Sequence, residues 1–385
     1  MLVQRGYKTQ LDPNNKQRTL LAKNAGAARY AFNWALNIKR DAMTKREKIP
    51  NAIELHRRLN ELKQTELGWM YEVSKCSPQE ALRNCDNAFN NFFRRCKQKK
   101  GKKGFPRFKS KKNGLGSFRL TGTIKVFDRH IQLPRIGKIK LKERGYLHNG
   151  KILSATVSER AGRWFVSLQM EETIEAPENK PQRAIGVDLG IKRLATCSDG
   201  EIFENPKALR SRLKKLQRLS RNVSRKQKGS QNRKKAQKKL AKLYYKIACI
   251  RQDTLHKFTT SLTKTKSRIV IEDLNVSGMM KNRRLSRAIA DVGLFEARRQ
   301  LEYKGKWYGC EIDVADRFYP SSKRCSSCGK INHNLQLSDR DYVCECGNDV
   351  DRDWNASVNL LNYRTVSSTG NYAFGERSSG STSVE

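Results

Sequence analysis

Apolar residues in the first hundred positions follow a helical spacing. Within Leu20–Ile38 they recur every three to four residues, the period of one face of an α-helix. The same pattern predicts helices around Ala52–Leu67 and Pro78–Arg95, the second of them preceded by Ser77, a suitable N-cap. Residues 16–96 are therefore expected to form a helical domain.

Strand patterns replace the helical ones in residues 117–172. Alternating apolar positions lie on both sides of a turn at Ala161-Gly162: Leu153, Ala155 and Val157 before it, and Trp164, Val166, Leu168 and Met170 after it. They predict a small antiparallel barrel or sheet. The two prolines of Ala176–Gln182 indicate a linker to the next domain.

A second set of strands follows this linker. The apolar run Ala184–Gly190 predicts a strand that carries Asp188 near its end, and Arg193–Cys197 predicts its hairpin partner. Another short apolar run, Arg268–Ile271, leads directly into Glu272. Both acidic residues are therefore expected where a strand ends.

Helical patterns fill most of the remaining chain. Two apolar stripes in residues 207–252 predict two helices packed as a hairpin, with a break at Gln227–Asn232. Further helices are predicted at 286–309 and Trp354–Tyr363. The last residues, 367–385, are rich in Ser, Gly and Thr, a composition typical of disorder.

The charge of the chain is strongly positive. Lys and Arg number 80 against 37 Asp and Glu, so the formal net charge is +43. Repulsion at this level opposes a compact fold unless a polyanion neutralises it. A partner with many phosphates, RNA or DNA, is therefore expected.

Two segments without any acidic residue concentrate this charge. Arg94–Lys112 holds eleven basic residues and residues 207–252 hold eighteen. A helix face exposed only to water usually mixes charge signs, because like charges one turn apart repel. A solvated run of charge is the alternative interpretation, and the two phenylalanines of the first segment could anchor it or stack on bases. The candidate nucleic-acid contacts are Lys102, Lys103, Phe105, Arg107, Phe108, Lys109, Arg225, Lys226, Lys228, Arg233 and Lys234.

Other classes of function are not expected. No uninterrupted apolar run of about 18 residues indicates a membrane span, and no Gly-x4-Gly-Lys-Ser/Thr loop indicates ATP as a partner. The five histidines are dispersed without a His-x-His pair. Six of the ten cysteines are scattered, which favours reduced thiols in a cytoplasmic protein.

The other four cysteines form two close pairs. Cys325 and Cys328 are followed, after fifteen residues, by Cys344 and Cys346. Four thiolates in two pairs suit tetrahedral Zn²⁺, and because they leave no open coordination position the zinc is expected to be structural. Free thiols or a disulfide are the alternatives.

Three acidic residues are candidates for catalysis. Asp188 and Glu272 end apolar strands, and Asp353 starts a helix; Asp351, two residues away, is an alternative to Asp353. This order suits an RNase H-like sheet whose acids converge at one edge and hold two Mg²⁺ or Mn²⁺ ions. Taken singly, a strand-end Asp is more often a turn former or a cap, Asp353 could merely start its helix, and Asp273 could be a surface neighbour. Only the three acids together, joined to the basic surface, favour catalysis.

Several motifs together resemble the TnpB (OrfB) family of bacterial insertion sequences, relatives of type V CRISPR effector nucleases. The match runs nearly end to end, and its motifs are Gly104–Lys109, Gly186–Lys192, Ile271–Leu274, Tyr319–Lys323, the four cysteines and Asp351–Ala356. In that family the catalytic acids match Asp188, Glu272 and Asp353, which leaves Asp351 as a helper. The Cys344-x-Cys346 spacing is tighter than in some members.

The resemblance implies a multidomain α+β fold. A wedge β-barrel (1–15 and 97–180) would hold an inserted helical recognition domain (16–96). An RNase H-like RuvC α/β nuclease domain (181–318 and 351–366) would be interrupted by a zinc ribbon (319–350) and followed by a disordered tail (367–385).

The resemblance also implies an activity. Family members bind a noncoding guide RNA copied from the transposon end and cleave complementary double-stranded DNA beside a short adjacent motif. A bacterial or archaeal, nucleoid-associated protein is expected. Two other possibilities are an RNA-guided repressor without nuclease activity and an RNase H-like transposase that performs strand transfer itself.

Overall fold

The computed structural model describes residues 2–98, 104–148, 150–174, 184–336 and 338–363. It divides into two compact units, residues 1–175 with 229–245 and residues 176–228 with 246–385, and each is described by itself. The predicted linker 176–182, the predicted tail 367–385 and the candidates Lys102 and Lys103 lie outside the described residues.

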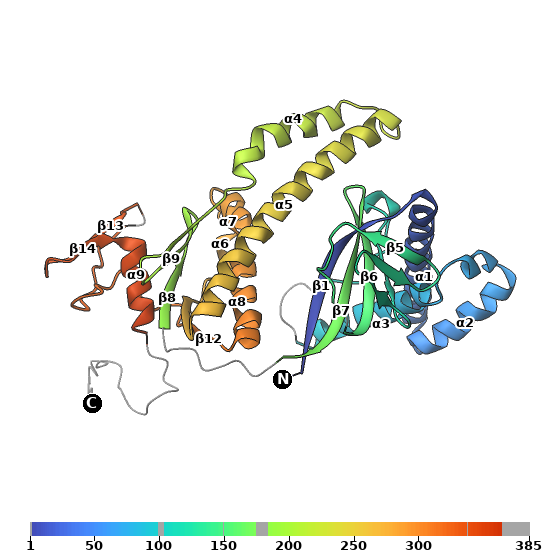
Figure 1. Ribbon diagram of the computed structural model, residues 1–385, viewed down its shortest axis with the longest axis horizontal. Helices are drawn as coiled ribbons and strands as arrows, with labels where there is room; N and C mark the ends of the chain where they lie inside the picture. Colours follow the sequence, from blue (N-terminus) through green and yellow to red (C-terminus); the bar gives the residue numbers. More distant parts are fainter. Residues whose placement is uncertain (1, 99–103, 149, 175–183, 337, 364–385) are drawn as a thin grey trace, which may run out of the picture. The chain divides into compact units, whose positions relative to one another are not determined.

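The first unit contains a seven-stranded antiparallel sheet with the order β2-β6-β7-β1-β5-β4-β3 (Figure 1). Its strands are β1 (Leu2–Asp12), β2 (Ser117–Leu120), β3 (Lys125–Val126), β4 (His130–Leu133), β5 (Gly137–Leu141), β6 (Lys151–Arg160) and β7 (Arg163–Thr173). The short strands β2 and β3 lie at opposite ends of this order. The described strands therefore form an open sheet, and the expectation of a closed barrel is corrected.

A β-bulge explains why one apolar residue of this sheet is less buried than its alternation predicts. The predicted turn at Ala161-Gly162 joins β6 to β7. Both of its residues have positive φ. The register shifts between Ile152 and Ser154, so the alternation of β6 changes at Leu153. Because of this shift, Leu153 is only partly buried, whereas the strict alternation predicted it to be a core residue.

Three long helices belong to the same unit, as their apolar spacing predicted. They are α1 (Asn15–Lys45), α2 (Ala52–Thr65) and α3 (Cys76–Lys97). Asn14 and Gln17 cap the start of α1 reciprocally, which lets the helix begin before its apolar stripe. Ser77 is not the N-cap of α3: it lies inside the helix, buried, and its hydroxyl donates to Asn24 Oδ1 at 2.7 Å.

Helices and sheet of the first unit share one hydrophobic core. Leu21 and Leu36 from α1 and Phe89 from α3 pack in the same cluster as Phe118 and Val166 from the sheet. The helical region 16–96 and the strands around it thus pack as one body, because the apolar face of the helices and the apolar face of the sheet bury each other.

The second unit is built on a mixed five-stranded sheet with the order β10-β9-β8-β11-β12. Its strands are β8 (Ala184–Leu189), β9 (Arg193–Cys197), β10 (Ile202–Glu204), β11 (Arg268–Glu272) and β12 (Glu311–Ala315). The strands β8, β9 and β10 form an antiparallel meander, and β8, β11 and β12 run parallel.

Helices accompany this sheet in sequence. They are α4 (Leu213–Ser224), α5 (Gln231–Thr265), of which residues 246–265 belong to this unit, α6 (Val276–Met279), α7 (Ser286–Val292), α8 (Leu294–Tyr308) and α9 (Arg352–Leu361). The single helix predicted at 286–309 is two helices, because Gly293 between them has a left-handed backbone with φ 80°. No helix among the described residues is long and apolar enough to cross a membrane.

The two faces of the second sheet differ. Ile185, Val187 and Ile271 pack into the main core together with α7, α8 and the second half of α5. The opposite face is covered by α9, which lies beside β8 in Figure 1 and shares a smaller cluster of Val270, Ala315 and Leu360.

Gly186 permits an unusually close approach between α9 and β8. A Cβ atom at this position would lie 1.9 Å from the Ser357 carbonyl oxygen and 2.4 Å from the Leu361 nitrogen. Real Cβ atoms essentially never come this close to backbone, so a side chain here would push the helix away.

We expect Gly186→Ala to lower the free energy of unfolding by about 1–3 kcal/mol or more, because the new methyl group meets backbone that cannot repack. Urea or thermal unfolding measures this loss. Gly26→Ala is the matched control, since a Cβ atom added at this position of α1 would have nothing within 4 Å. It should stabilise the protein by about 0.5–1 kcal/mol; equal midpoints for the Gly186 variant and the unsubstituted chain would contradict the close contact.

Candidate active site and metal centre

Asp188 and Glu272 lie side by side on neighbouring strands. The parallel pairing of β8 with β11 sets Val187 opposite Ile271, so the two acids are the next residues on each strand. Since Val187 and Ile271 point into the main core, the acids point to the opposite face, which α9 covers.

Asp353 approaches from the first turn of α9. The helix starts there because Asp351 is its N-cap: Asp351 Oδ1 accepts from the backbone nitrogens of Asp353 at 2.9 Å and Trp354 at 3.1 Å. The second oxygen of Asp351 accepts from Arg193 Nη1 at 3.0 Å. Both Asp351 oxygens are thus engaged, while no side chain of the described residues hydrogen-bonds to the Asp353 carboxylate.

The three acids interact electrostatically. Burial raises the pKa of Asp188 well above its usual value, and the charges of Glu272 and Asp353 raise it further; Arg352 opposes the shift. Burial also raises the pKa of Glu272, against the hydrogen bond that Ser321 Oγ donates to its Oε1. Asp188, with Glu272 and Asp353 from distant parts of the chain, therefore forms a cluster of acidic groups.

Asp273 stands apart from this cluster, as expected of a neighbour. Its two oxygens accept from Arg298 and Arg317. The Arg298 hydrogen bond is the largest effect that holds the pKa of Asp273 below its usual value. A carboxylate paired with two guanidinium groups already has its counter-charges.

The four predicted zinc ligands come together. The Sγ atoms of Cys325, Cys328, Cys344 and Cys346 all lie within 4.8 Å of one another, with 3.6 Å between Cys325 and Cys346 and between Cys328 and Cys344. Tetrahedral Zn²⁺ with Zn–S bonds of about 2.3 Å needs sulfurs about 3.8 Å apart. The donor set and its spacing fit a structural zinc ion.

The electrostatics of Cys325 also fit a metal-binding thiolate. Burial alone would raise the pKa of this thiol, but hydrogen bonds from the backbone nitrogens of Cys328 and Ser327 and from Asn348 lower it to about 6. Thiolate is the form that binds zinc. Among the described residues, these cysteines form the group whose metal-ligating atoms all lie within 4.8 Å of one another. The carboxylate oxygens of Asp188, Glu272 and Asp353 do not form such a group.

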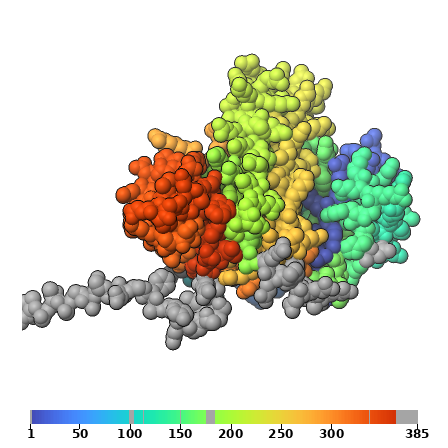
Figure 2. Space-filling model, turned by 60° about the vertical axis from the view of Figure 1, so that its left-hand side comes forward, coloured from blue at the N-terminus to red at the C-terminus, as the bar shows by residue number. Residues whose placement is uncertain are grey.

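The cysteine lobe (residues 319–351) leads directly into α9. Its hairpin consists of β13 (Asp341–Val343) and β14 (Asp349–Asp351), and the last residue of β14 is the cap of α9. Tyr342 is buried at its centre and donates to the carbonyl oxygens of Lys323 at 3.1 Å and Lys330 at 3.2 Å. In Figure 2 the orange-to-red residues of this lobe and α9 form one rounded surface.

Buried amide side chains of α9 hold the lobe, and the sequence pattern missed them. Asn355 donates to Arg324 O at 2.7 Å and accepts from Ser326 N at 2.9 Å. Asn359 donates to Ser321 O at 2.8 Å. Two asparagines four residues apart, among the apolar positions of this helix, are the signal that could have found this contact.

Ser321 is a second residue that sequence reasoning missed. It is buried, its hydroxyl donates to Glu272, and its carbonyl oxygen is held by Asn359. The residue therefore links the cysteine lobe to one of the three acids. A serine in a loop carries no pattern by itself, so only the fold reveals this role.

The described nucleic-acid candidates differ in exposure. Phe105 packs edge-on against Phe89 and Phe92, with ring centroids 5.6 and 5.1 Å apart, and so anchors its segment. Phe108 is 46% exposed, with Arg40 over its ring. Arg233 is partly buried. The remaining described candidates are exposed: Arg107, Lys109, Arg225, Lys226, Lys228 and Lys234.

Three family models match the chain. Residues 156–283 match a model described as "Probable transposase", and residues 295–360 match "Cas12f1-like, TNB domain". Residues 1–48 match a "Helix-turn-helix domain" model, although within residues 2–48 the structure has one strand and one long helix.

Curated relatives match over almost the whole chain. A Streptomyces pristinaespiralis protein, "Putative RNA-guided DNA endonuclease", is 38% identical over 93% of this chain and 89% of its own length. The chain belongs to the TnpB (OrfB) family. A second family relative, "Putative RNA-guided DNA endonuclease InsQ" of Escherichia coli K12, is 34% identical over 92% of this chain and 91% of its own.

A solved structure also matches this TnpB-family chain. A chain of the cryo-EM structure of a CRISPR-Cas12f ternary complex is 16% identical, with a TM-score of 0.37, over 91% of this chain and 82% of that one.

We expect Cys325→Ser to reduce bound zinc from about one ion per chain and to lower the melting temperature, because three thiolates hold zinc less well than four. Metal analysis of the purified protein measures the zinc. Cys249→Ser, outside the cluster on α5, is the control and should keep its zinc. A folded Cys325 variant with unchanged zinc content would rule out the site.

Proposed function

We propose that this chain is an RNA-guided DNA endonuclease of the TnpB type, with Asp188, Glu272 and Asp353 as its catalytic residues. The observation that carries the proposal is the meeting of Asp188 with Glu272 from the neighbouring strand and with Asp353 from the first turn of α9, whose charges both raise the pKa of Asp188. Carboxylates held together without enough counter-charge are costly, and such groups are normally paired or bound to cations.

The chemistry of the donors fits magnesium. Carboxylate oxygens suit Mg²⁺ or Mn²⁺ better than zinc, and a bound cation relieves the repulsion that raises the pKa of Asp188. When bound, two such ions about 3.5–4 Å apart activate the attacking water and stabilise the leaving oxygen of a phosphodiester.

The remaining residues of the site position these acids. Ser321 orients Glu272, and Asp351 with Arg193 fixes the start of α9 and so the place of Asp353. In this assignment residues 181–318 and 351–366 form a RuvC-like nuclease domain, residues 319–350 a zinc ribbon, and residues 1–15 with 97–180 the wedge around the helical recognition domain 16–96.

The guide is an RNA derived from the transposon that encodes the chain. A net charge of +43 supports binding of a structured RNA and of an RNA–DNA heteroduplex through their backbones, while base pairing supplies the sequence specificity. The two relatives are named as putative RNA-guided DNA endonucleases, which supports RNA and DNA as the partners. The target is double-stranded DNA next to a short adjacent motif.

We expect Asp188→Asn to reduce Mg²⁺-dependent DNA cleavage more than about a hundredfold, since several kcal/mol of transition-state stabilisation is lost. RNA that co-purifies with the chain should remain bound, because the proposal gives this acid a role in cleavage and none in holding the guide. Sequencing of that RNA and a cleavage assay on matching DNA measure both. Undiminished cutting would contradict the assignment. Without co-purifying RNA a strand-transfer transposase would be favoured, and RNA-guided binding without cleavage by the unsubstituted chain would indicate a repressor.

Asp188→Asn should also raise the melting temperature in EDTA at neutral pH. The folded protein raises the pKa of Asp188, so ionisation of this acid costs stability as the pH rises through that pKa, and the variant escapes the cost. The difference should vanish near pH 3, where the acid is protonated in both states.

Asp273→Asn is the matched control of opposite sign. Arg298 and Arg317 hold the pKa of Asp273 down, so this charge stabilises the fold at neutral pH and its contribution is lost as the pH falls. Thermal unfolding from pH 3 to 8 measures both variants. Two melting curves that shift in the same direction would refute the electrostatic difference between the two acids.

A further inference from the structure

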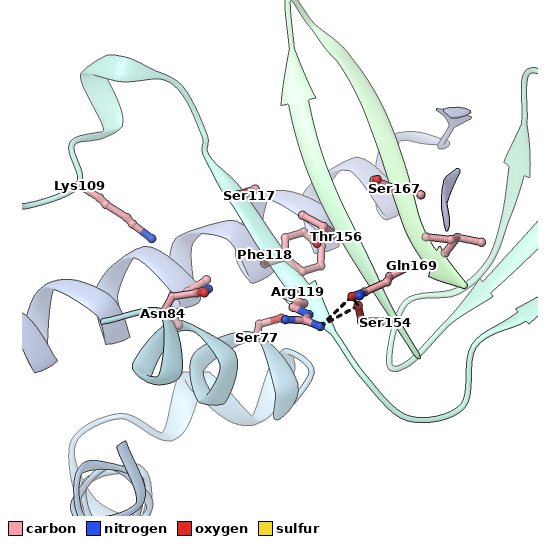
Figure 3. A pocket seen from close by; sticks show the side chains of 14 residues that line it. Ser77, Asn84, Lys109, Ser117, Phe118, Arg119, Ser154, Thr156, Ser167 and Gln169 are labelled. Carbon is pink, nitrogen blue, oxygen red and sulfur yellow. Dashed lines mark hydrogen bonds between the residues drawn. The ribbon is translucent and has the colours of Figure 1, made fainter. Parts of the chain in front are cut away.

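A polar cavity of about 410 Å³ lies in the first unit, where the edge strand β2 meets α3 (Figure 3). In the sheet, Arg119 pairs with Thr156 and Thr156 with Ser167, so these side chains form a row across three strands. Asn84 of α3 lies across from them, and the amine of Lys109 points toward the cavity in Figure 3. The cavity is separate from the acids and cysteines of the second unit.

The guanidinium of Arg119 is fixed before any ligand binds. Its Nη2 donates to Ser154 Oγ at 3.0 Å and to Gln169 Oε1 at 3.3 Å, the dashed lines of Figure 3. Gln169 is itself held, because it donates to Gln4 Oε1 at 2.8 Å. A guanidinium has five N–H donors, so several remain for a ligand. A held guanidinium is the preferred protein group for a phosphate.

The charge around the cavity favours an anion. Glu80 is a buried carboxylate nearby, 2.7 Å from Arg83 Nη1 and 3.8 Å from Arg119 Nε. Lys109 adds a further cation at the rim. Glu80 is thus shared by two guanidinium groups, and the lining itself contains two cations, Arg119 and Lys109, and no carboxylate.

The rest of the lining suits a sugar. The side chains of Asn84, Ser117, Thr156 and Ser167 add an amide and three hydroxyl groups to the lining. Hydroxyl groups donate and accept, as does the 2′-OH of ribose, which DNA lacks. The aromatic residue of the lining, Phe118, is 3% exposed and offers no face on which a base could stack.

We propose that this cavity binds one ribose-phosphate unit of the guide RNA, with the phosphate at Arg119 and Lys109 and the 2′-OH among Thr156, Ser167 and Asn84. The proposal rests on the proposed function, which supplies the RNA. Since the contacts go to sugar and phosphate, the cavity fixes the position of the strand without reading its sequence.

Analogue interference tests the proposal. RNA that co-purifies with the full chain is transcribed with about one random 2′-deoxy nucleotide per molecule, and bound and unbound pools are compared. The unsubstituted chain should disfavour deoxy substitution at the nucleotide in the cavity by about two- to tenfold, the size of one hydrogen bond. In Thr156→Val/Ser167→Ala this interference should disappear while the signals elsewhere persist. Val keeps the branched shape that a strand favours, which protects folding.

Two further variants sharpen the test. Arg119→Gln should weaken binding roughly tenfold and reduce the salt dependence by about one phosphate contact. Arg129→Gln, exposed and outside the cavity, is the control and should keep the interference pattern.

The outcomes separate the two proposals. If the unsubstituted chain binds no RNA, the proposed function fails. If RNA binds but the hydroxyl variant keeps the full interference pattern, the cavity assignment is overturned. A free nucleotide shares this chemistry, so adenosine monophosphate is added at millimolar concentration in a thermal-shift assay. Stabilisation that Arg119→Gln abolishes, with an unchanged interference pattern, would identify a small-molecule site instead.

Discussion

The contact between α9 and β8 is the constraint on which the proposed active site depends. Gly186 has no side chain, so the backbone of Ser357 and Leu361 reaches the strand directly. This contact sets the first turn of α9, with Asp353, over the same face of the sheet as Asp188 and Glu272. No attraction between the acidic side chains is needed to bring them together, because the packing of the α9 backbone against β8 does so. In the proposed function, the electrostatic cost at Asp188 is one that the fold carries for catalysis.

The cysteine lobe serves the same helix. It ends in Asp351, whose carboxylate caps α9, and its loop is held by Asn355 and Asn359 from that helix. Small lobes without a large core commonly need a metal to fold. A zinc ion at the four cysteines would therefore act on cleavage at a distance, by fixing where α9 begins and where Ser321 holds Glu272.

Local patterns were enough to predict much of this arrangement. The helices of the first unit, the strand before Asp188, the strand before Glu272 and the gathering of four cysteines follow from periodicity and spacing. The split of the predicted helix 286–309 needed the backbone of Gly293, and the position of Leu153 needed a bulge. Both depend on tertiary packing, which overrides local pattern.

Contacts between distant segments were beyond such patterns. Nothing local marks Ser321 as the partner of Glu272, or Gly186 as the place where a helix from the far end of the described chain must dock. The open sheet of the first unit shows the same limit, since alternation predicts strands but not whether their ends close. The positive charge of the chain was easier to predict, because net charge is counted directly from the sequence.

Binding of Mn²⁺ to the full chain, followed by electron paramagnetic resonance, tests the central claim most directly. The account predicts two magnetically coupled ions per chain, and loss of the coupled signal in Glu272→Gln while the fold and the zinc remain. Mn²⁺ binding that is absent from the unsubstituted chain, or that is unchanged in the Glu272 variant, would contradict it.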